Sequence, residues 1–449
     1  MVMVATVVGS EKTTTASDGN KVPPLLWSAP VFSGGGYASE ALNYLKGAKD
    51  VGYPVLGTVQ HGDSYDHGYV SGLPREDYEV LREWSREGTR LAGGGEDVFV
   101  HVCHSEPGAW DVESGPRYAT SICPLPAASA AVGRTMFETD RIPSGWEHRL
   151  NAMDAVWVPT AFHRDVFVSN GVLPQKVKVL PESVDVVFFD PEADHVVHNP
   201  YLLDDDPSLF ATGGGSRRVQ EDGEEGEEEP FRFVSVFKWE KRKAWDVLLR
   251  AYFEAFGSTE DKDKVELYIV TRAFHSSSDF EAAIAAFVEE EGLGEMAHLP
   301  RVRVLSGIPQ ASMPAMYAAM DAFVLPSRGE GWGRPHTEAM AMGLPIIATN
   351  WSGPTEFMTQ DNSFPLPIRG LVPVGEGPFA DHLWADPDPE VLVSLLREVA
   401  QSEDDVLRAV GERARADMVA SFSNRAIAYH LLDLVNDLAI DEAPRHTEL

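Results

Sequence analysis

Short apolar runs alternate with helix-like segments along the first part of the chain. Apolar runs bounded by turn residues predict buried strands, and they occur at residues 25–32, 54–60, 97–102, 131–137, 155–158 and 176–180. Helical patterns at residues 37–49 and 161–169 lie between some of these runs. Strands that alternate with helices are typical of a parallel α/β sheet. We therefore expect residues 22–195 to form one α/β domain.

The same alternation returns in the second half of the chain. Strand-like runs occur at residues 231–236, 265–270, 302–305, 321–325 and 345–349, and helical patterns at 389–399, 406–420 and 425–438. We expect a second α/β domain over residues 231–424, followed by a C-terminal helix and tail at 425–449.

Two segments lack this pattern. Residues 1–21 are polar and predict a disordered tail. Residues 196–230 include the acidic runs 204–206 and 221–229, which have too few apolar side chains to order themselves. We interpret 196–230 as an acidic, low-complexity linker or insert between the domains. A regulatory or partner-binding role for it stays open.

Residues 327–345 hold the most informative pattern. A buried strand at 321–326 leads into a glycine loop with Glu330, and a helix with Glu338 follows. Pro335 fits the first helical position, and Gly343 fits a left-handed stop. Free N–H groups and the helix dipole make such a helix start suitable for phosphate, while the two carboxylates can accept hydrogen bonds from sugar or ribose hydroxyls.

The segment resembles the E-x7-E motif of family 4 glycosyltransferases, which have the GT-B fold and retaining chemistry. The resemblance rests on Glu-Gly-Trp-Gly at 330–333, Glu-Ala-Met-Ala-Met-Gly-Leu-Pro at 338–345, and residues 348–356. It implies two Rossmann-like domains facing across a cleft, with a final helix returning to the first domain. The alternative is that Glu338 merely sits favourably at a helix start.

The resemblance also implies roles for residues of the second domain. Glu338 would hold the ribose and Glu330 the sugar hydroxyls. Lys238 and Lys243 would neutralise the donor diphosphate, although such a basic cluster can also be a solvated surface. Many relatives have Gly where this chain has Ala244. This difference affects the backbone geometry expected of the basic loop but not its charge. The other implied donor-binding residues are Gly331, Trp332, Gly333, Arg334 and Glu356.

In the first domain, residues 34–36 are three glycines before a predicted helix, so the backbone can approach a ligand closely. By resemblance, Gly35 and Gly36 would face the donor, but an ordinary tight turn is the alternative. The loop matches only half of a dinucleotide fingerprint, because the expected acidic residue after the second strand is missing.

The resemblance identifies His104 as the histidine that would bond the transferred sugar, with His101 as a rival. Residues 137–143 match the family around the acceptor cleft, which makes Glu138, Asp140 and Arg141 acceptor-side candidates. These three residues could instead pair with one another structurally.

The composition of the chain limits the classes of molecule that it is expected to bind. The chain has 449 residues, 43% of them hydrophobic, and a formal net charge of −33, so nucleic acid and anionic membrane surfaces are poor general partners. Only Cys103 and Cys123 are cysteines, which suits a reducing compartment with unpaired, buried thiols. No metal site and no transmembrane segment is expected, and a cytoplasmic location is the default.

The sequence thus predicts a metal-independent hexosyltransferase that needs a UDP- or GDP-sugar as donor and no separate cofactor. Its acceptor, a glycan, lipid, protein or small molecule, is not indicated. The sequence also does not indicate the donor base and sugar, the oligomeric state, the role of the acidic insert or peripheral membrane association. Two alternatives are a catalytically silent GT-B protein that binds nucleotide or glycan, and an NAD-dependent oxidoreductase.

Overall fold

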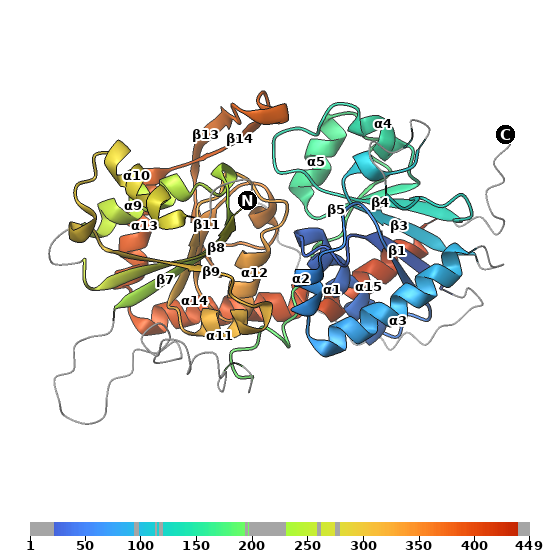
Figure 1. Ribbon diagram of the computed structural model, residues 1–449, viewed down its shortest axis with the longest axis horizontal. Helices are drawn as coiled ribbons and strands as arrows, with labels where there is room; N and C mark the ends of the chain where they lie inside the picture. Colours follow the sequence, from blue (N-terminus) through green and yellow to red (C-terminus); the bar gives the residue numbers. More distant parts are fainter. Residues whose placement is uncertain are drawn as a thin grey trace.

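The computed structural model describes residues 22–93, 98–112, 115, 120–193, 196, 230–257, 262–273 and 279–438. The expected N-terminal tail and nearly all of the acidic insert lie outside these residues. The chain forms two α/β domains, each built on a six-stranded parallel sheet (Figure 1). Among the described helices, none is long and apolar enough to cross a membrane.

The first domain contains a sheet in the order β2-β1-β3-β4-β5-β6. Its strands are β1 (Leu25–Ala29), β2 (Leu56–Gln60), β3 (Val100–His104), β4 (Ala130–Arg134), β5 (Ala155–Val158) and β6 (Val177–Val179). Its helices are α1 (Gly36–Asp50), α2 (His67–Ser71), α3 (Arg75–Ala92), α4 (Trp146–Asn151) and α5 (Ala161–Ser169), with a 3₁₀ turn η1 (Pro107–Ala109).

The second domain contains a sheet in the order β12-β11-β10-β7-β8-β9. Its strands are β7 (Phe231–Trp239), β8 (Val265–Ala273), β9 (Arg301–Ser306), β10 (Ala322–Leu325), β11 (Ile346–Thr349) and β12 (Phe364–Leu366). Its helices are α9 (Trp245–Phe256), α10 (Phe280–Glu290), α11 (Met313–Ala318), α12 (Arg334–Ala341), α13 (Pro389–Gln401) and α14 (Asp404–Asp417). Short 3₁₀ turns are η2 (Lys241–Lys243), η3 (Met296–His298), η4 (Gln310–Ser312), η5 (Gly353–Glu356) and η6 (Gly377–Phe379).

The apolar patterns explain these elements. All five positions of β1, β3 and β4 are buried, as strands covered by helices on both faces require. The main cores join each sheet to its helices and include Trp27 and Trp157 in the first domain and Phe233, Tyr252 and Phe323 in the second. The predicted strands match the observed ones within a few residues. The 18-residue helix α3 was not predicted.

Two of the described segments reach from the second domain to the first. A π-helical turn, η7 (Met418–Phe422), follows α14 and leads into α15 (Asn424–Asn436). Helix α15 buries Ile427, Leu431 and Val435 in the core of the first domain, and Figure 1 shows it lying beside α1. The antiparallel hairpin of β13 (Ile368–Pro373) and β14 (Leu383–Pro387) extends from the second domain toward the first (Figure 1).

Candidate active site

A cleft of about 2030 Å³ lies between the domains and is lined by both. Its walls come from places where the strand order reverses. In the first sheet β1 lies between β2 and β3, and in the second β7 lies between β8 and β10. Open α/β sheets bind ligands at the carboxyl ends of strands beside such reversals. The loops after β1, β3, β7 and β10 therefore converge on one cavity.

The glycine loop after β10 leads directly into α12. Gly333 has φ of +106°, and a Cβ there would lie 2.7 Å from Nδ1 of His336, so this N-cap position favours glycine. The helix begins at Arg334, which puts Pro335 at the second helical position rather than the predicted first. Gly343 is left-handed, with φ of +75°, just past the helix end, as predicted.

Glu330 is held by a lysine of the second domain. Nζ of Lys243 lies 2.8 Å from both carboxylate oxygens, and the two residues are 8% and 5% exposed. Burial by itself would raise the pKa of Glu330, but Lys243 and Arg242 outweigh it and hold the pKa at about 2. Glu330 is therefore anionic and fixed at the cavity wall.

Glu338 also lines the cavity, from the first turns of α12. The hydroxyl of Tyr317 donates a hydrogen bond to its carboxylate at 3.2 Å. Burial raises the pKa of Glu338 to about 7, although Arg334 and Tyr317 act in the opposite direction. The two glutamates of the motif thus face one cavity in different electrostatic surroundings.

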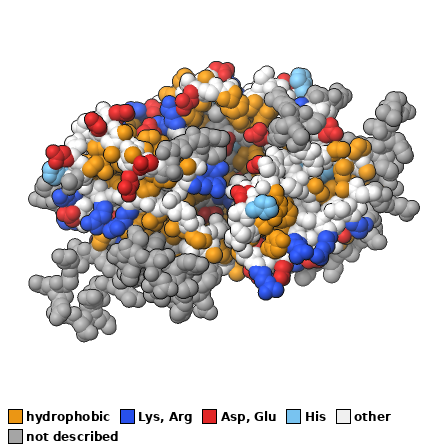
Figure 2. Space-filling view, viewed as in Figure 1, with side chains coloured by type: hydrophobic (Ala, Val, Ile, Leu, Met, Phe, Trp, Pro, Cys, Tyr) orange, Lys and Arg blue, Asp and Glu red, His pale blue; other side chains and the backbone are white. Residues whose placement is uncertain are grey.

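Cations gather at the same place. Lys238 at the end of β7 is in register with Arg272 at the end of β8, and both line the cavity together with Arg242. Burial lowers the pKa of Lys238, and Arg272 and Lys243 add to this through repulsion. Figure 2 shows basic side chains gathered in the hollow between the two domains. Such a cluster suits a ligand with several negative charges.

Sequence reasoning missed Arg272. Its signal was present, since it ends the strand next to the one that carries Lys238. Strand order, which the sequence did not reveal, was needed to bring the two cations together. Arg242 was seen only as part of a basic run, yet it bonds the carbonyl of Gly329 at 2.7 Å and lies 3.3 Å from Glu330.

Ala244 adopts the left-handed conformation, with φ of +52° and ψ of +39°. Only glycine takes this conformation without a steric cost from Cβ, which gives a physical reason for the glycine that the resemblance implies at this position. Ala244 keeps the turn, since η2 still leads into α9 and puts Lys243 at the cavity.

Arg334 makes an ion pair across the cleft. Its Nη1 lies 3.4 Å from Glu182, which follows β6 of the first domain. Burial raises the pKa of Glu182 to about 8, Glu40 adds to the rise, and Arg334 acts against it. Glu182 was also missed by the sequence analysis, although it is an acidic residue just beyond a strand end.

The first glycine loop faces the cavity. Gly35 is the N-cap of α1 and Gly36 its first residue, and both line the cleft. A Cβ on either would meet no atom within 4 Å, so the open space beside them is available to a ligand. Strand β2 ends at Gln60, which accepts the N–H of Phe32 at 2.9 Å. The acidic residue of a dinucleotide site is thus absent from the end of this strand.

His104 does not reach the cleft in this structure. Its side chain is fully buried, with Nδ1 accepting the indole N–H of Trp27 at 3.0 Å and Nε2 lying 3.0 Å from Glu40. Glu40 also accepts a 2.7 Å hydrogen bond from Arg134. The expected contact between His104 and the transferred sugar does not fit this geometry, because both ring nitrogens are engaged behind the cavity wall. His101 is equally enclosed.

Two other donor-site candidates lie differently from the expectation. The indole of Trp332 is 2% exposed and packs between Phe357 and Phe422, although the residue is among those that line the cleft. Glu356 accepts the backbone N–H of Ala161 at the start of α5 at 2.8 Å. It joins the domains and is not among the described residues that line the cleft.

The three acceptor-side candidates separate into two groups. Glu138 lines the cleft, and its carboxylate lies 3.6 Å from Arg242. Asp140 instead pairs with Arg141 at 2.8 Å and exchanges two hydrogen bonds with the backbone of Leu383 on β14. The alternative that these residues pair with one another structurally thus holds for Asp140 and Arg141, which attach the hairpin of the second domain to the first.

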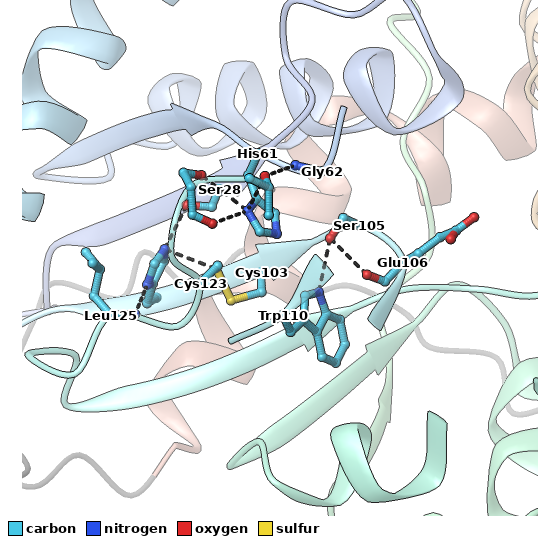
Figure 3. Close-up of a disulfide and its surroundings, with 12 residues drawn as sticks. Ser28, His61, Gly62, Cys103, Ser105, Glu106, Trp110, Cys123 and Leu125 are labelled. Carbon is cyan, nitrogen blue, oxygen red and sulfur yellow. Dashed lines mark hydrogen bonds between the residues drawn. A yellow bond between two sulfur atoms is a disulfide. The ribbon is translucent and has the colours of Figure 1, made fainter. Parts of the chain in front are cut away.

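The cysteines correct a further expectation. Cys103 and Cys123 form a disulfide, so the prediction of unpaired thiols was wrong, and the argument for a reducing compartment loses its basis. The two residues lie on β3 and in the loop before β4, where the fold brings them together (Figure 3). The indole of Trp110 donates to Ser105 nearby at 3.1 Å.

His101, Cys103 and Cys123 are the group of potential metal ligands found among the described residues. Nδ1 of His101 accepts the N–H of Leu125 at 2.9 Å, so its proton resides on Nε2, which lies 2.8 Å from the hydroxyl of Ser28. With the sulfurs joined to each other, this group does not offer free metal ligands.

Comparisons with known proteins agree with this geometry. Residues 230–381 match the family model of glycosyl transferases group 1. D-inositol 3-phosphate glycosyltransferase of Corynebacterium glutamicum (strain R) is 31% identical over 142 residues, which are 32% of this chain and 29% of that protein. O-antigen chain mannosyltransferase B of Escherichia coli is 43% identical over 49 residues, 11% of this chain and 13% of that protein. The chain thus aligns with less than a third of the length of these curated relatives.

Solved structures match over a much longer range. The crystal structure of Anabaena Alr3699/HepE in complex with UDP and glucose aligns with a TM-score of 0.61 at 13% identity, covering 93% of this chain and all of that one. WaaG, a glycosyltransferase involved in lipopolysaccharide biosynthesis, aligns with a TM-score of 0.54 at 14% identity, covering 92% of this chain and 100% of that one. The chain therefore has the GT-B fold, with two Rossmann-like domains, and residues 230–381 in its second domain are similar to the group 1 glycosyl transferases.

Proposed function

We propose that this protein is a retaining glycosyltransferase of the family 4 type that moves a hexosyl unit from a UDP- or GDP-linked sugar to an acceptor. The observation that carries the proposal is the meeting of two motif glutamates and a cation cluster in one interdomain cavity. Glu330, Glu338, Lys238 and Lys243 all line that cavity. Carboxylates suit hydroxyl groups, and clustered cations suit a diphosphate.

Each group has a distinct part in this proposal. Glu338 accepts hydrogen bonds from the ribose, and Glu330 from hydroxyls of the transferred sugar. Lys238, Lys243 and Arg272, with the N–H groups at residues 331–334, bind the diphosphate. The direct role that the resemblance implied for His104 is left out, because the ring is enclosed by Trp27 and Glu40.

In the transfer, the bond between the anomeric carbon and the diphosphate oxygen breaks as the acceptor oxygen bonds to the same face. The proton of the acceptor hydroxyl passes to a leaving phosphate oxygen. Negative charge grows on the diphosphate, so fixed cations stabilise the transition state more than the ground state. The cations supply this stabilisation themselves, so the proposed reaction needs no metal ion.

A hydrolysis assay across UDP-, GDP- and ADP-sugars tests the proposal, with and without a chelator. We expect release of one nucleotide in both conditions and at least a hundredfold loss in Lys243→Ala. Lys241→Ala is the matched control, because this exposed lysine of the same turn is not among the described cavity residues. If Lys243→Ala kept the activity of the wild type, the proposed role of Lys243 in binding the diphosphate would be wrong.

A second variant separates catalysis from binding. Glu330→Gln should keep nucleotide affinity and lower turnover, since the residue faces the sugar and not the nucleotide. Nucleotide binding without turnover of any donor, also when a mixed acceptor panel is added, would favour the catalytically silent alternative over the proposed reaction.

A further inference from the structure

The first-domain wall opposite the donor glutamate is acidic. Glu106 follows β3 and Glu138 follows β4, and these two strands are neighbours whose ends His104 and Arg134 are in register. Both carboxylates line the cleft beside Tyr37. Burial raises the pKa of Tyr37, and the negative charges of Glu138, Glu40 and Glu106 raise it further.

Arg242 connects this wall to the donor side. Its Nη1 lies 3.6 Å from Glu138 of the first domain and 3.3 Å from Glu330 of the second. Its Nη2 lies 2.8 Å from Glu240. One guanidinium is thus shared by three carboxylates. Through this guanidinium, Glu138 of the first domain lies close to Glu330, and the cation beside it is already paired.

The lysines of the first domain lie elsewhere, although Arg272 of the second domain reaches the carbonyl of Gly34 at 3.4 Å and Arg425 of α15 also lines the cleft. Among the described first-domain residues that line the cleft, the Lys and Arg residues are Lys46 and Lys49, both near the C-terminal end of α1. Lys46 pairs with Asp77 at 3.2 Å and with Asp185 at 2.7 Å. Lys49 is thirteen residues beyond Gly36, or about 20 Å along the helix, and so is remote from the glycine loop.

We propose that the acceptor presents hydroxyl or ammonium groups to Glu106 and Glu138 and carries no phosphate on its reacting sugar ring. Ionised carboxylates only accept hydrogen bonds, so they can bind hydroxyls and ammonium but leave a phosphate oxygen unsatisfied and repelled. Neutral polyols and amino sugars therefore fit this wall. The proposal rests on the proposed function, because it needs the donor sugar to lie at Glu330.

This acceptor class differs from the phosphorylated substrate in the names of the D-inositol 3-phosphate glycosyltransferases that this chain matches in part. Selectivity then lies in the first-domain loops after β3 and β4. These loops can vary while the donor site of the second domain stays the same.

The test is binding of glucose, glucosamine and glucose 6-phosphate to the nucleotide-saturated protein, measured by saturation-transfer NMR titration. We expect glucosamine to bind at least as tightly as glucose, and glucose 6-phosphate at least tenfold more weakly. Glu106→Lys should remove or reverse the discrimination against the phosphate. Glu83→Lys, the same charge change at an exposed position of α3 that is not among the described cleft-lining residues, should leave the order unchanged.

Two results would overturn the proposal. One is binding of glucose 6-phosphate that equals or exceeds that of glucose in the wild type. The other is a protein that releases nucleotide from its donor but binds neither glucose nor glucosamine. Failure to bind any nucleotide would instead count against the proposed function itself, so the two failures are distinguishable.

Discussion

The backbone carbonyl oxygen of Glu138 lies 2.3 Å from the position that a Cβ atom would occupy on Gly329. Glu138 belongs to the first domain and Gly329 to the glycine loop of the second. Neighbouring Gly331 is similarly close to the first domain, since a Cβ there would lie 2.1 Å from the sulfur of Met136. The domains can therefore approach this closely only because the loop lacks side chains at both positions.

Gly329→Ala should hold the domains apart without unfolding either one. The obstacle is a backbone atom, which cannot rotate away as the tip of a side chain can. A misplacement of about 1 Å between reacting groups can cost about a hundredfold in rate, so we expect turnover to fall by that order. Steady-state donor turnover measures the loss, and small-angle X-ray scattering should show a more open particle.

Gly72→Ala is the control for this prediction. It adds the same methyl group at a glycine with φ of −91°, where a Cβ would make only ordinary contacts of 3.5 Å or more. A compact particle with normal turnover in Gly329→Ala would show that the interdomain approach tolerates a shift of this size.

The sequence predicted the parts of the site that depend on local pattern. Gly343 stops α12 as expected, and Glu330 and Glu338 face one cavity, because strand, loop and helix are each encoded within a few residues. Arg272, Glu182 and the disulfide depend on which strands are neighbours. Hydrophobic periodicity does not specify strand order, so these contacts could not be read from it.

His104 and the hairpin of β13 and β14 illustrate a second limit. A residue after a strand was expected to reach the ligand, but Glu40 and Trp27 fix His104 in the layer behind the wall. The hairpin lies in a segment with two prolines and three glycines between 367 and 377. Its role comes from pairing with Asp140, more than 240 residues away, which no local signal could predict.

Stability should fall as the pH rises through neutrality. Burial raises the pKa of Glu182 from 4.5 to about 8 and that of Glu338 from 4.5 to about 7. Carboxyl groups with raised native pKa values contribute their full stability below about pH 4.5 and lose it as the pH passes the native values. The free energy of unfolding should therefore decrease between pH 6 and pH 9, by an amount on the order of a few kcal/mol.

Glu182→Gln should flatten this pH dependence, because a neutral amide keeps the shape of the protonated carboxyl without its ionisation. Denaturant unfolding at a series of pH values measures the effect. Glu83→Gln, on the exposed side of α3, should reproduce the wild-type curve. A wild-type stability that rises from pH 6 to pH 9 would contradict the electrostatic argument.

The disulfide between Cys103 and Cys123 should stabilise the first domain. It closes a loop with a sequence separation of 20 residues, and limiting the freedom of the unfolded chain over such a loop is worth about 3 kcal/mol. The free energy of unfolding of the double variant Cys103→Ala/Cys123→Ala, measured with denaturant, should be lower by that amount. Thiol titration of the denatured wild type should find no free thiol, and two reactive thiols would contradict the pairing.

Arg134 and Glu40 form a fully buried ion pair in the first domain, at 0% and 1% side-chain exposure. Arg134 also donates to the carbonyl of Leu180 at 3.0 Å, and with His104 it holds the pKa of Glu40 down to about 2 against the effect of burial. Arg134→Met would leave a buried carboxylate without its main partner. Such a loss typically costs about 3–5 kcal/mol.

The double variant Glu40→Gln/Arg134→Met identifies the cause of that cost. If the unpaired charge is responsible, adding Glu40→Gln should recover part of the lost stability, so that the two single effects do not add. Arg75→Met breaks the exposed pair with Glu79, whose side chains are 91% and 59% exposed, and should have almost no effect. The nucleotide affinity of the double variant, measured by titration, is the decisive readout, because a network that only supports the wall behind Tyr37 should leave this affinity close to that of the wild type. A large loss of nucleotide affinity in the double variant, whose net charge is unchanged, would instead indicate that the Glu40 network contacts the donor.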